Sequence, residues 1–155
     1  DHGKIEKNLV SYVMKLKKEI KSGGQNWVSK DTYTTINKYS VLKDDEFKTI
    51  NDFVMNSISN YINKLHINYN FNCMSGWFNV YDKNGNIKRP FANRSNDIKS
   101  DNNKIFDERY YYKPIPGSII VFPSSLEHCV EKENSNKTRI TIAYNFNINN
   151  KSETQ

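Results

Sequence analysis

The apolar residues of this chain change their spacing once, from a helical repeat to a strict alternation, and this change constrains the fold most. Before residue 67 they recur three or four positions apart in two stretches, as on the buried face of a helix. From Ile67 to Asn72 apolar and polar residues alternate, as in a strand with one polar face, and further short strand-like runs follow. Two helices followed by a run of short strands predict an α+β fold, with the helices backing a β-sandwich or barrel.

Both predicted helices carry an apolar stripe that we interpret as a packing face. The first stripe consists of Ile5, Leu9, Tyr12, Val13, Leu16 and Ile20. Ser22-Gly23-Gly24 ends this helix. The second stripe, on a helix that Asp44 caps, consists of Phe47, Ile50, Phe53, Val54, Ile58, Tyr61, Ile62 and Leu65. Residues 27–40, between the helices, are rich in Thr and Tyr and are predicted to be irregular.

The second half of the chain is predicted to hold short strands joined by turns and loops. Strands are expected at residues 67–72, 76–82, 109–113, 118–122, 128–130 and 138–147. Turns are expected at 82–85, 114–117 and 123–127, and a long polar loop at 86–107. A length of 155 residues favours one domain. Within residues 1–155 we expect a helical part at 1–66, a β part at 67–148 and a polar tail at 149–155.

Charge and cysteine content narrow the partners and the compartment. The net charge is +6, but the basic residues are spread out and no nucleic-acid-binding signature is visible, so a nucleic-acid partner is not expected. Cys73 and Cys129 lie in predicted strands without metal-binding spacing, which indicates reduced thiols. No apolar run is long enough to span a membrane, and no signal peptide is visible. We therefore expect a cytoplasmic protein without a membrane partner.

Three polar residues near the C-terminal end are candidates for a binding site. In the last predicted strand Arg139 and Thr141 share one face. The other face, which suits packing under the helices, carries Ile140, Ile142, Tyr144 and Phe146. A guanidinium inside a barrel needs either a protein carboxylate or an anionic ligand, because burying it alone is costly. His128 precedes it by about one hairpin, so a metal at the imidazole and an acid at the guanidinium would share one small molecule.

Three stretches resemble 2-oxoglutarate/iron(II)-dependent oxygenases, above all the small ones common in phages and bacteria. Residues 117–128, Gly-Ser-Ile-Ile-Val-Phe-Pro-Ser-Ser-Leu-Glu-His, resemble the strand, loop and distal-histidine segment of these proteins. Residues 139–147, Arg-Ile-Thr-Ile-Ala-Tyr-Asn-Phe-Asn, resemble their closing strand, whose Arg-x-Ser/Thr holds the distal carboxylate of 2-oxoglutarate. Residues 75–83, Ser-Gly-Trp-Phe-Asn-Val-Tyr-Asp-Lys, resemble the strand that leads into their first metal motif.

The resemblance implies a double-stranded β-helix (jelly roll) backed by the two N-terminal helices. It also implies Fe(II) and 2-oxoglutarate as cofactors and hydroxylation of an unknown substrate. His128 would be the distal iron ligand, and Arg139 and Thr141 would bind 2-oxoglutarate. Asn79 and Tyr81 would line the cofactor pocket. No catalytic residue is assigned beyond these binding residues.

The sequence departs from the family's pattern at the first metal motif. The family has a His-x-Asp or His-x-His soon after the strand that contains Trp77, but the histidines here are His2, His66 and His128 alone. A catalytic iron site needs about three protein ligands, so His128 by itself does not complete one.

An absent motif also leaves the jelly roll incomplete, because removing central strands opens a barrel and exposes its edges. Three alternatives remain: the chain closes differently, a second copy supplies the edge in a homodimer, or the sequence is an incomplete copy of a longer protein. The alternative function is a non-catalytic jelly-roll protein, descended from such an oxygenase, with a binding or structural role.

Overall fold

The computed structural model describes residues 2–24, 32–65, 69–81, 112–113, 115–126, 128 and 137–150. Its elements, in chain order, are α1 (His2–Glu19), β1 (Thr32–Thr34), the short 3-10 helices η1 (Val41–Lys43) and η2 (Asp45–Phe47), α2 (Lys48–Lys64), β2 (Tyr69–Tyr81) and β3 (Arg139–Asn150). The predicted turn at 82–85, the loop at 86–107 and most of the strand at 109–113 lie outside the described residues. No helix among those described is both long and apolar enough to cross a membrane.

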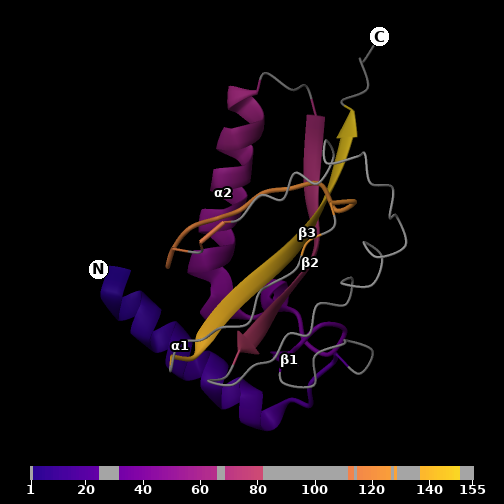
Figure 1. The fold of residues 1–155 in the computed structure, drawn as a ribbon. Helices are drawn as coiled ribbons and strands as arrows, with labels where there is room; N and C mark the ends of the chain where they lie inside the picture. The colour runs from indigo at the N-terminus through magenta and orange to yellow at the C-terminus, as the bar shows by residue number, and fades with distance from the viewer. Residues whose placement is uncertain are drawn as a thin grey trace, which may run out of the picture.

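The three strands form one antiparallel sheet in the order β1-β2-β3. Both helices cover the same face of this sheet (Figure 1). α1 packs near the end where Tyr81 pairs with Arg139, whereas α2 packs near the opposite end, against Phe71 and Phe146. The sheet therefore has an apolar face under the helices and a polar face turned away from them.

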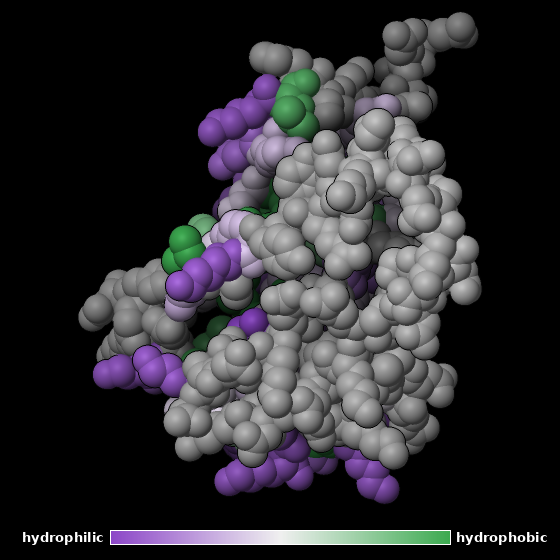
Figure 2. Space-filling view, viewed as in Figure 1, coloured by the Kyte–Doolittle hydropathy of each residue, from purple (hydrophilic) through white to green (hydrophobic). Residues whose placement is uncertain are grey.

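The two predicted helices are confirmed, and their apolar stripes are buried in part. α1 buries Val13 and Leu16, and α2 buries one residue per turn, namely Val54, Ile58 and Ile62. The prediction is wrong for Phe53, Tyr61 and Leu65, which are exposed. A helix that contacts the sheet along a single ridge buries a narrower stripe than the sequence pattern indicates. Figure 2 shows mainly hydrophilic side chains on the described outer surface of the helices, with isolated hydrophobic ones among them.

β2 is one long strand that contains a β-bulge. The prediction of two separate strands at 67–72 and 76–82 is therefore wrong. The register with β3 shifts between Cys73 and Ser75, so that Met74 has no partner of its own. Phe71 and Cys73 face the helices before the bulge, and the even-numbered Gly76 and later residues face them after it. The bulge absorbs one residue, which explains why the alternation changes phase in the sequence.

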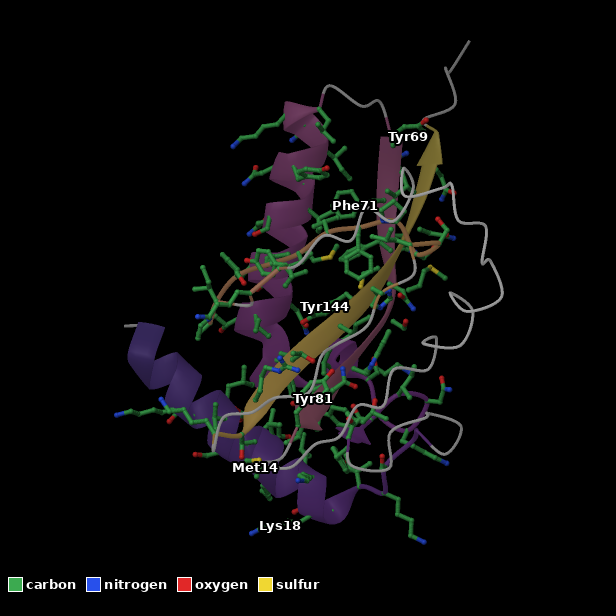
Figure 3. The ribbon with its side chains drawn as sticks, in the orientation of Figure 1. Met14, Lys18, Tyr69, Phe71, Tyr81 and Tyr144 are labelled. Atoms are coloured by element: carbon green, nitrogen blue, oxygen red, sulfur yellow. The ribbon has the colours of Figure 1, made fainter. Side chains whose placement is uncertain are left out.

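The main core lies between α1, the η segments and the Tyr81 end of the sheet. Phe47 and Phe78, both fully buried, stack with their ring centroids 6.1 Å apart. Val13, Val41 and Val80 close the space around them. A second, smaller cluster joins α2 to the sheet, and Figure 3 shows Phe71 and Tyr144 on the side of the sheet toward α2. Both clusters hold the strands from one side and leave the other face to polar residues.

Asp44 ties α1 to the segment that leads into α2. The hydroxyl of Tyr12 donates to Asp44 Oδ2 at 2.8 Å, and the hydroxyl of Tyr39 donates to the same oxygen. The other carboxylate oxygen accepts from the backbone N–H of Glu46, and Asp44 thereby caps η2. The helix α2 itself begins four residues after Asp44, at Lys48. Desolvation raises the pKa of Asp44, but these hydrogen bonds outweigh it and hold the pKa below its ordinary value.

Two further strand predictions are corrected. Thr32–Thr34, in the stretch predicted to be irregular, forms β1 and pairs with the end of β2. Residues 118–122 do not form the predicted strand, and their side chains are exposed. The turns around them are confirmed, because Ser118 N–H donates to Ile115 O and Leu126 N–H donates to Pro123 O, both at 3.0 Å. β3 corresponds to the predicted last strand at 138–147. It continues three residues further, to Asn150, and so includes the first two residues of the predicted tail at 149–155.

Candidate functional site

The polar face of the sheet gathers four of the five predicted site residues in two rows across the strands. One row runs from Thr34 of β1 through Asn79 of β2 to Thr141 of β3. The neighbouring row runs from Thr32 through Tyr81 to Arg139. Residues directly opposite in an antiparallel pair project to the same side, so these six side chains share one surface.

Arg139 is positioned by the aromatic ring opposite it. Its guanidinium carbon lies 4.4 Å from the ring centroid of Tyr81, which is within the range of a cation–π contact. Tyr81 is buried at the last position of β2, so the ring is fixed by its surroundings. A guanidinium held over a buried ring loses little further side-chain entropy when it binds an anion.

Asn79 and Thr141 are joined by a hydrogen bond. Asn79 Nδ2 donates to Thr141 Oγ1 at 3.2 Å, and Asn79 is only 4% exposed. Because Thr141 Oγ1 accepts this bond, its hydroxyl proton points elsewhere and is available to an acceptor on the polar face. The result is a hydroxyl donor one row away from the Arg139 guanidinium.

On this face, two buried polar atoms of β2 have no hydrogen-bond partner among the described residues. They are the indole Nε1 of Trp77, a donor, and the amide Oδ1 of Asn79, an acceptor. Trp77 and Asn79 are two positions apart on β2 and therefore share the face. Each such buried group costs about 1–3 kcal/mol when it stays unpaired, and a water molecule or a ligand group would satisfy it.

His128, the predicted metal ligand, is exposed and contacts its own segment. Its ring lies 4.7 Å from that of Phe122, and its Nδ1 lies 2.9 Å from the carbonyl oxygen of Leu126. A carbonyl oxygen only accepts, so Nδ1 carries a proton in this contact, and in the neutral form of the ring the lone pair then lies on Nε2. This is the tautomer that metal-binding histidines commonly adopt. Within the described residues, His128 makes no contact with the four sheet residues of the site.

The described part of the chain contains no group of three His, Cys, Asp or Glu side chains that would hold a metal ion. His66 and Cys129 lie outside it. Cys73 is a free thiol on the helix-facing side of β2, where burial raises its pKa.

Sequence reasoning missed Thr32 and Thr34, the β1 members of the two rows. Their signal was present in the order Thr-Tyr-Thr, in which Tyr33 packs into the core and both threonines turn to the polar face. A strand of three residues is too short for its alternation to stand out from a loop.

The antiparallel sheet of this small protein carries Asn79, Tyr81, Arg139 and Thr141 together on one face, and comparison with known families identifies its class. A family model described as putative 2OG-Fe(II) oxygenase matches residues 24–145, which include α2, the whole of β2 and both polar rows. The chain belongs to this family. The family implies a jelly-roll fold and the use of Fe(II) and 2-oxoglutarate. No curated protein and no solved structure matches the chain.

Proposed function

We propose that this protein is a 2-oxoglutarate- and iron(II)-dependent dioxygenase that hydroxylates a substrate. In this proposal Arg139 and Thr141 bind the distal carboxylate of 2-oxoglutarate, Asn79 and Tyr81 line the cofactor pocket, and His128 is a metal ligand. The observation that carries the proposal is the pairing of Tyr81 with Arg139 and of Asn79 with Thr141 on one face of the sheet.

The residues of these rows fit a carboxylate. The Arg139 guanidinium offers a charge and N–H donors, and the Thr141 hydroxyl offers one more donor because Asn79 occupies its oxygen. Two donors from adjacent rows of a sheet match the two oxygens of one carboxylate. The Tyr81 ring supports the guanidinium from one side.

The residues described here do not by themselves fit an iron ion, so we derive no reaction step through the metal. His128 has the tautomer of a ligand, with Nε2 available. A complete iron site needs further protein ligands, and the sequence has no His-x-Asp or His-x-His after Trp77. We propose that a full double-stranded β-helix is built on the β2–β3 pair.

A second candidate function follows from the missing motif. A non-catalytic jelly-roll protein of the same descent would keep the carboxylate rows and bind an anionic ligand without oxidising anything. The two candidates differ in one property, which is iron(II) binding in the presence of 2-oxoglutarate.

The test is an anaerobic titration of the purified protein with iron(II), with and without 2-oxoglutarate, followed by the visible charge-transfer band of the ternary complex. We expect the band in the wild-type protein and its loss in His128→Ala. His2→Ala, at the start of α1, is the matched histidine control and should leave the band unchanged. A band that survives in His128→Ala refutes the assignment of His128.

2-Oxoglutarate binding is measured separately by calorimetry, so that the carboxylate rows are tested apart from the metal. Arg139→Gln should weaken binding by about tenfold or more, the value of a charge-assisted hydrogen bond. Thr141→Val, which keeps the side-chain shape, should weaken it by about fivefold. Binding of 2-oxoglutarate without any iron(II) band selects the non-catalytic candidate, and unchanged binding in Arg139→Gln contradicts both.

A further inference from the structure

The side chain of Asn79 carries both a donor and an acceptor, and it meets Thr141 through the donor. Asn79 Nδ2 donates to Thr141 Oγ1 at 3.2 Å, so the hydroxyl proton of Thr141 is left for another partner. The opposite orientation of the amide would place Asn79 Oδ1 against the hydroxyl and take up that proton. The orientation of one buried amide therefore decides whether Thr141 can donate to a ligand.

The neighbouring indole favours the observed orientation of the Asn79 amide. Trp77 Nε1, on the adjacent row of the same face, is a buried donor, and the Asn79 atom without a partner among the described residues is the acceptor Oδ1. One water molecule that accepts from the indole and donates to Oδ1 satisfies both atoms. With the amide turned over, both remaining groups would be donors, which are not complementary.

We propose that Asn79 is a positioning residue that makes the site selective for a carboxylate over the corresponding amide. By donating to Thr141, Asn79 leaves the hydroxyl proton to the ligand, and a carboxylate presents only acceptors to it. An amide in the same place presents one oxygen and one NH2 group, and the NH2 group matches neither the hydroxyl proton nor the Arg139 guanidinium. The inference rests on the proposed function, in which Arg139 and Thr141 bind the distal carboxylate of 2-oxoglutarate.

The test compares two ligands that differ only at the distal end. N-oxalylglycine has the length and the two terminal carboxylates of 2-oxoglutarate, and N-oxalylglycinamide has an amide in place of the distal carboxylate. Calorimetry gives the affinity of each ligand, and the ratio of the two affinities is the selectivity. Thr141→Val should weaken the acid by about fivefold, the effect of one hydrogen bond, and leave the amide nearly unchanged. Loss of affinity for the amide alone would show a hydroxyl of the opposite polarity and overturns the proposal.

Asn79→Asp reverses the polarity of the positioning group. It keeps the shape of the side chain but replaces the donor by acceptors, so that the Thr141 proton turns toward the new carboxylate. We expect the selectivity for the acid to fall by about tenfold or more, because an added charge and a reversed hydroxyl both oppose the ligand carboxylate.

A double-mutant cycle separates the hydroxyl from the added charge. In a Thr141→Val background no hydroxyl is present, so Asn79→Asp should change the selectivity by about fivefold less than it does in the wild-type background. In a Thr141→Ser background the hydroxyl is kept, and the full effect should return. Equal effects of Asn79→Asp in these two backgrounds overturn the proposal.

Asn145 provides a matched control on the same face of the sheet. Its Nδ2 donates to Ser75 Oγ at 3.3 Å, but this pair is two rows away from Thr141, and Asn145 is exposed. Asn145→Asp makes the same chemical change and should leave the selectivity nearly unchanged, because solvent and salt screen an exposed charge. A loss of selectivity as large as that in Asn79→Asp overturns the proposal.

Arg139→Gln separates this inference from the proposed function. Wild-type protein that does not bind N-oxalylglycine refutes the proposed function, and this inference falls with it. Wild-type protein that binds N-oxalylglycine, loses it in Arg139→Gln and keeps its selectivity in Asn79→Asp refutes this inference alone.

Discussion

Replacing Gly76 with alanine tests how closely the side chains of Val41 and Tyr144 pack against β2. Gly76 lies on the helix-facing side of β2, opposite Tyr144. A Cβ atom there would lie 2.7 Å from Val41 Cγ2 and 2.9 Å from Tyr144 Cδ1. Neither neighbour has room to retreat, because Val41 is fully buried and the hydroxyl of Tyr144 donates to Asn51 Oδ1 at 2.7 Å. We expect Gly76→Ala to lower the free energy of unfolding by about 2 kcal/mol, as overpacked cores do.

A double-mutant cycle with Val41→Ala makes the reasoning refutable. Val41→Ala alone removes two buried methyl groups and should cost about 2 kcal/mol, including the cavity that it leaves. In the double variant the new methyl group occupies part of that cavity. Its free energy of unfolding should therefore fall by about 1–2 kcal/mol less than the sum of the two single losses.

The measurement is urea denaturation followed by tryptophan fluorescence, with the slope of each transition compared among the variants. The slopes should agree, because the change concerns packing and not the extent of unfolding. Strict additivity in the cycle would refute the contact between Val41 and Gly76. Wild-type stability of Gly76→Ala would refute the close approach as a whole.

Two more predictions concern the anchor at Asp44 and the bulge in β2. Asp44→Asn should lower stability by about 1 kcal/mol near neutral pH through weaker hydrogen bonds from Tyr12 and Tyr39. The folded-state pKa of Asp44 lies below its ordinary 3.8. The stability difference between the wild-type protein and Asp44→Asn should therefore be full above pH 3.8 and should fade as the pH falls through the folded-state pKa. A stability difference that stays constant in urea titrations from about pH 7 to about pH 2 would contradict this. Deleting Met74 should lower the melting temperature far less than deleting Val80, since Met74 is 59% exposed and unpaired, whereas Val80 is fully buried; the reverse order would refute the bulge.

The sequence predicted correctly those elements in which the spacing of apolar residues repeats over many positions. Both helices, the last strand and its division into a helix-facing and a polar face are confirmed. The pairing of Asn79 and Tyr81 with Thr141 and Arg139 depends on strand register, which no single segment contains. It became visible only when β2 and β3 were aligned in the sheet.

The failed predictions have local physical causes. The bulge at Met74 interrupts the alternation, so one strand reads as two. The apolar run at 118–122 has the composition of a buried strand, yet composition alone does not supply a hydrogen-bonded neighbour, and Phe122 packs against His128 instead. The position of His128 relative to the sheet stays a prediction.

The pairing of Tyr81 with Arg139 brings together the two ends of a long stretch of chain, residues 82–138. Closing such a loop costs conformational entropy that grows only with the logarithm of its length, by about 0.6 kcal/mol for each doubling. Gain or loss of a dozen residues there changes this cost by a small fraction of the stability of a domain. The pairing of Tyr81 with Arg139 and of Asn79 with Thr141 thus belongs to a part of the sheet whose stability is nearly independent of the length of that stretch.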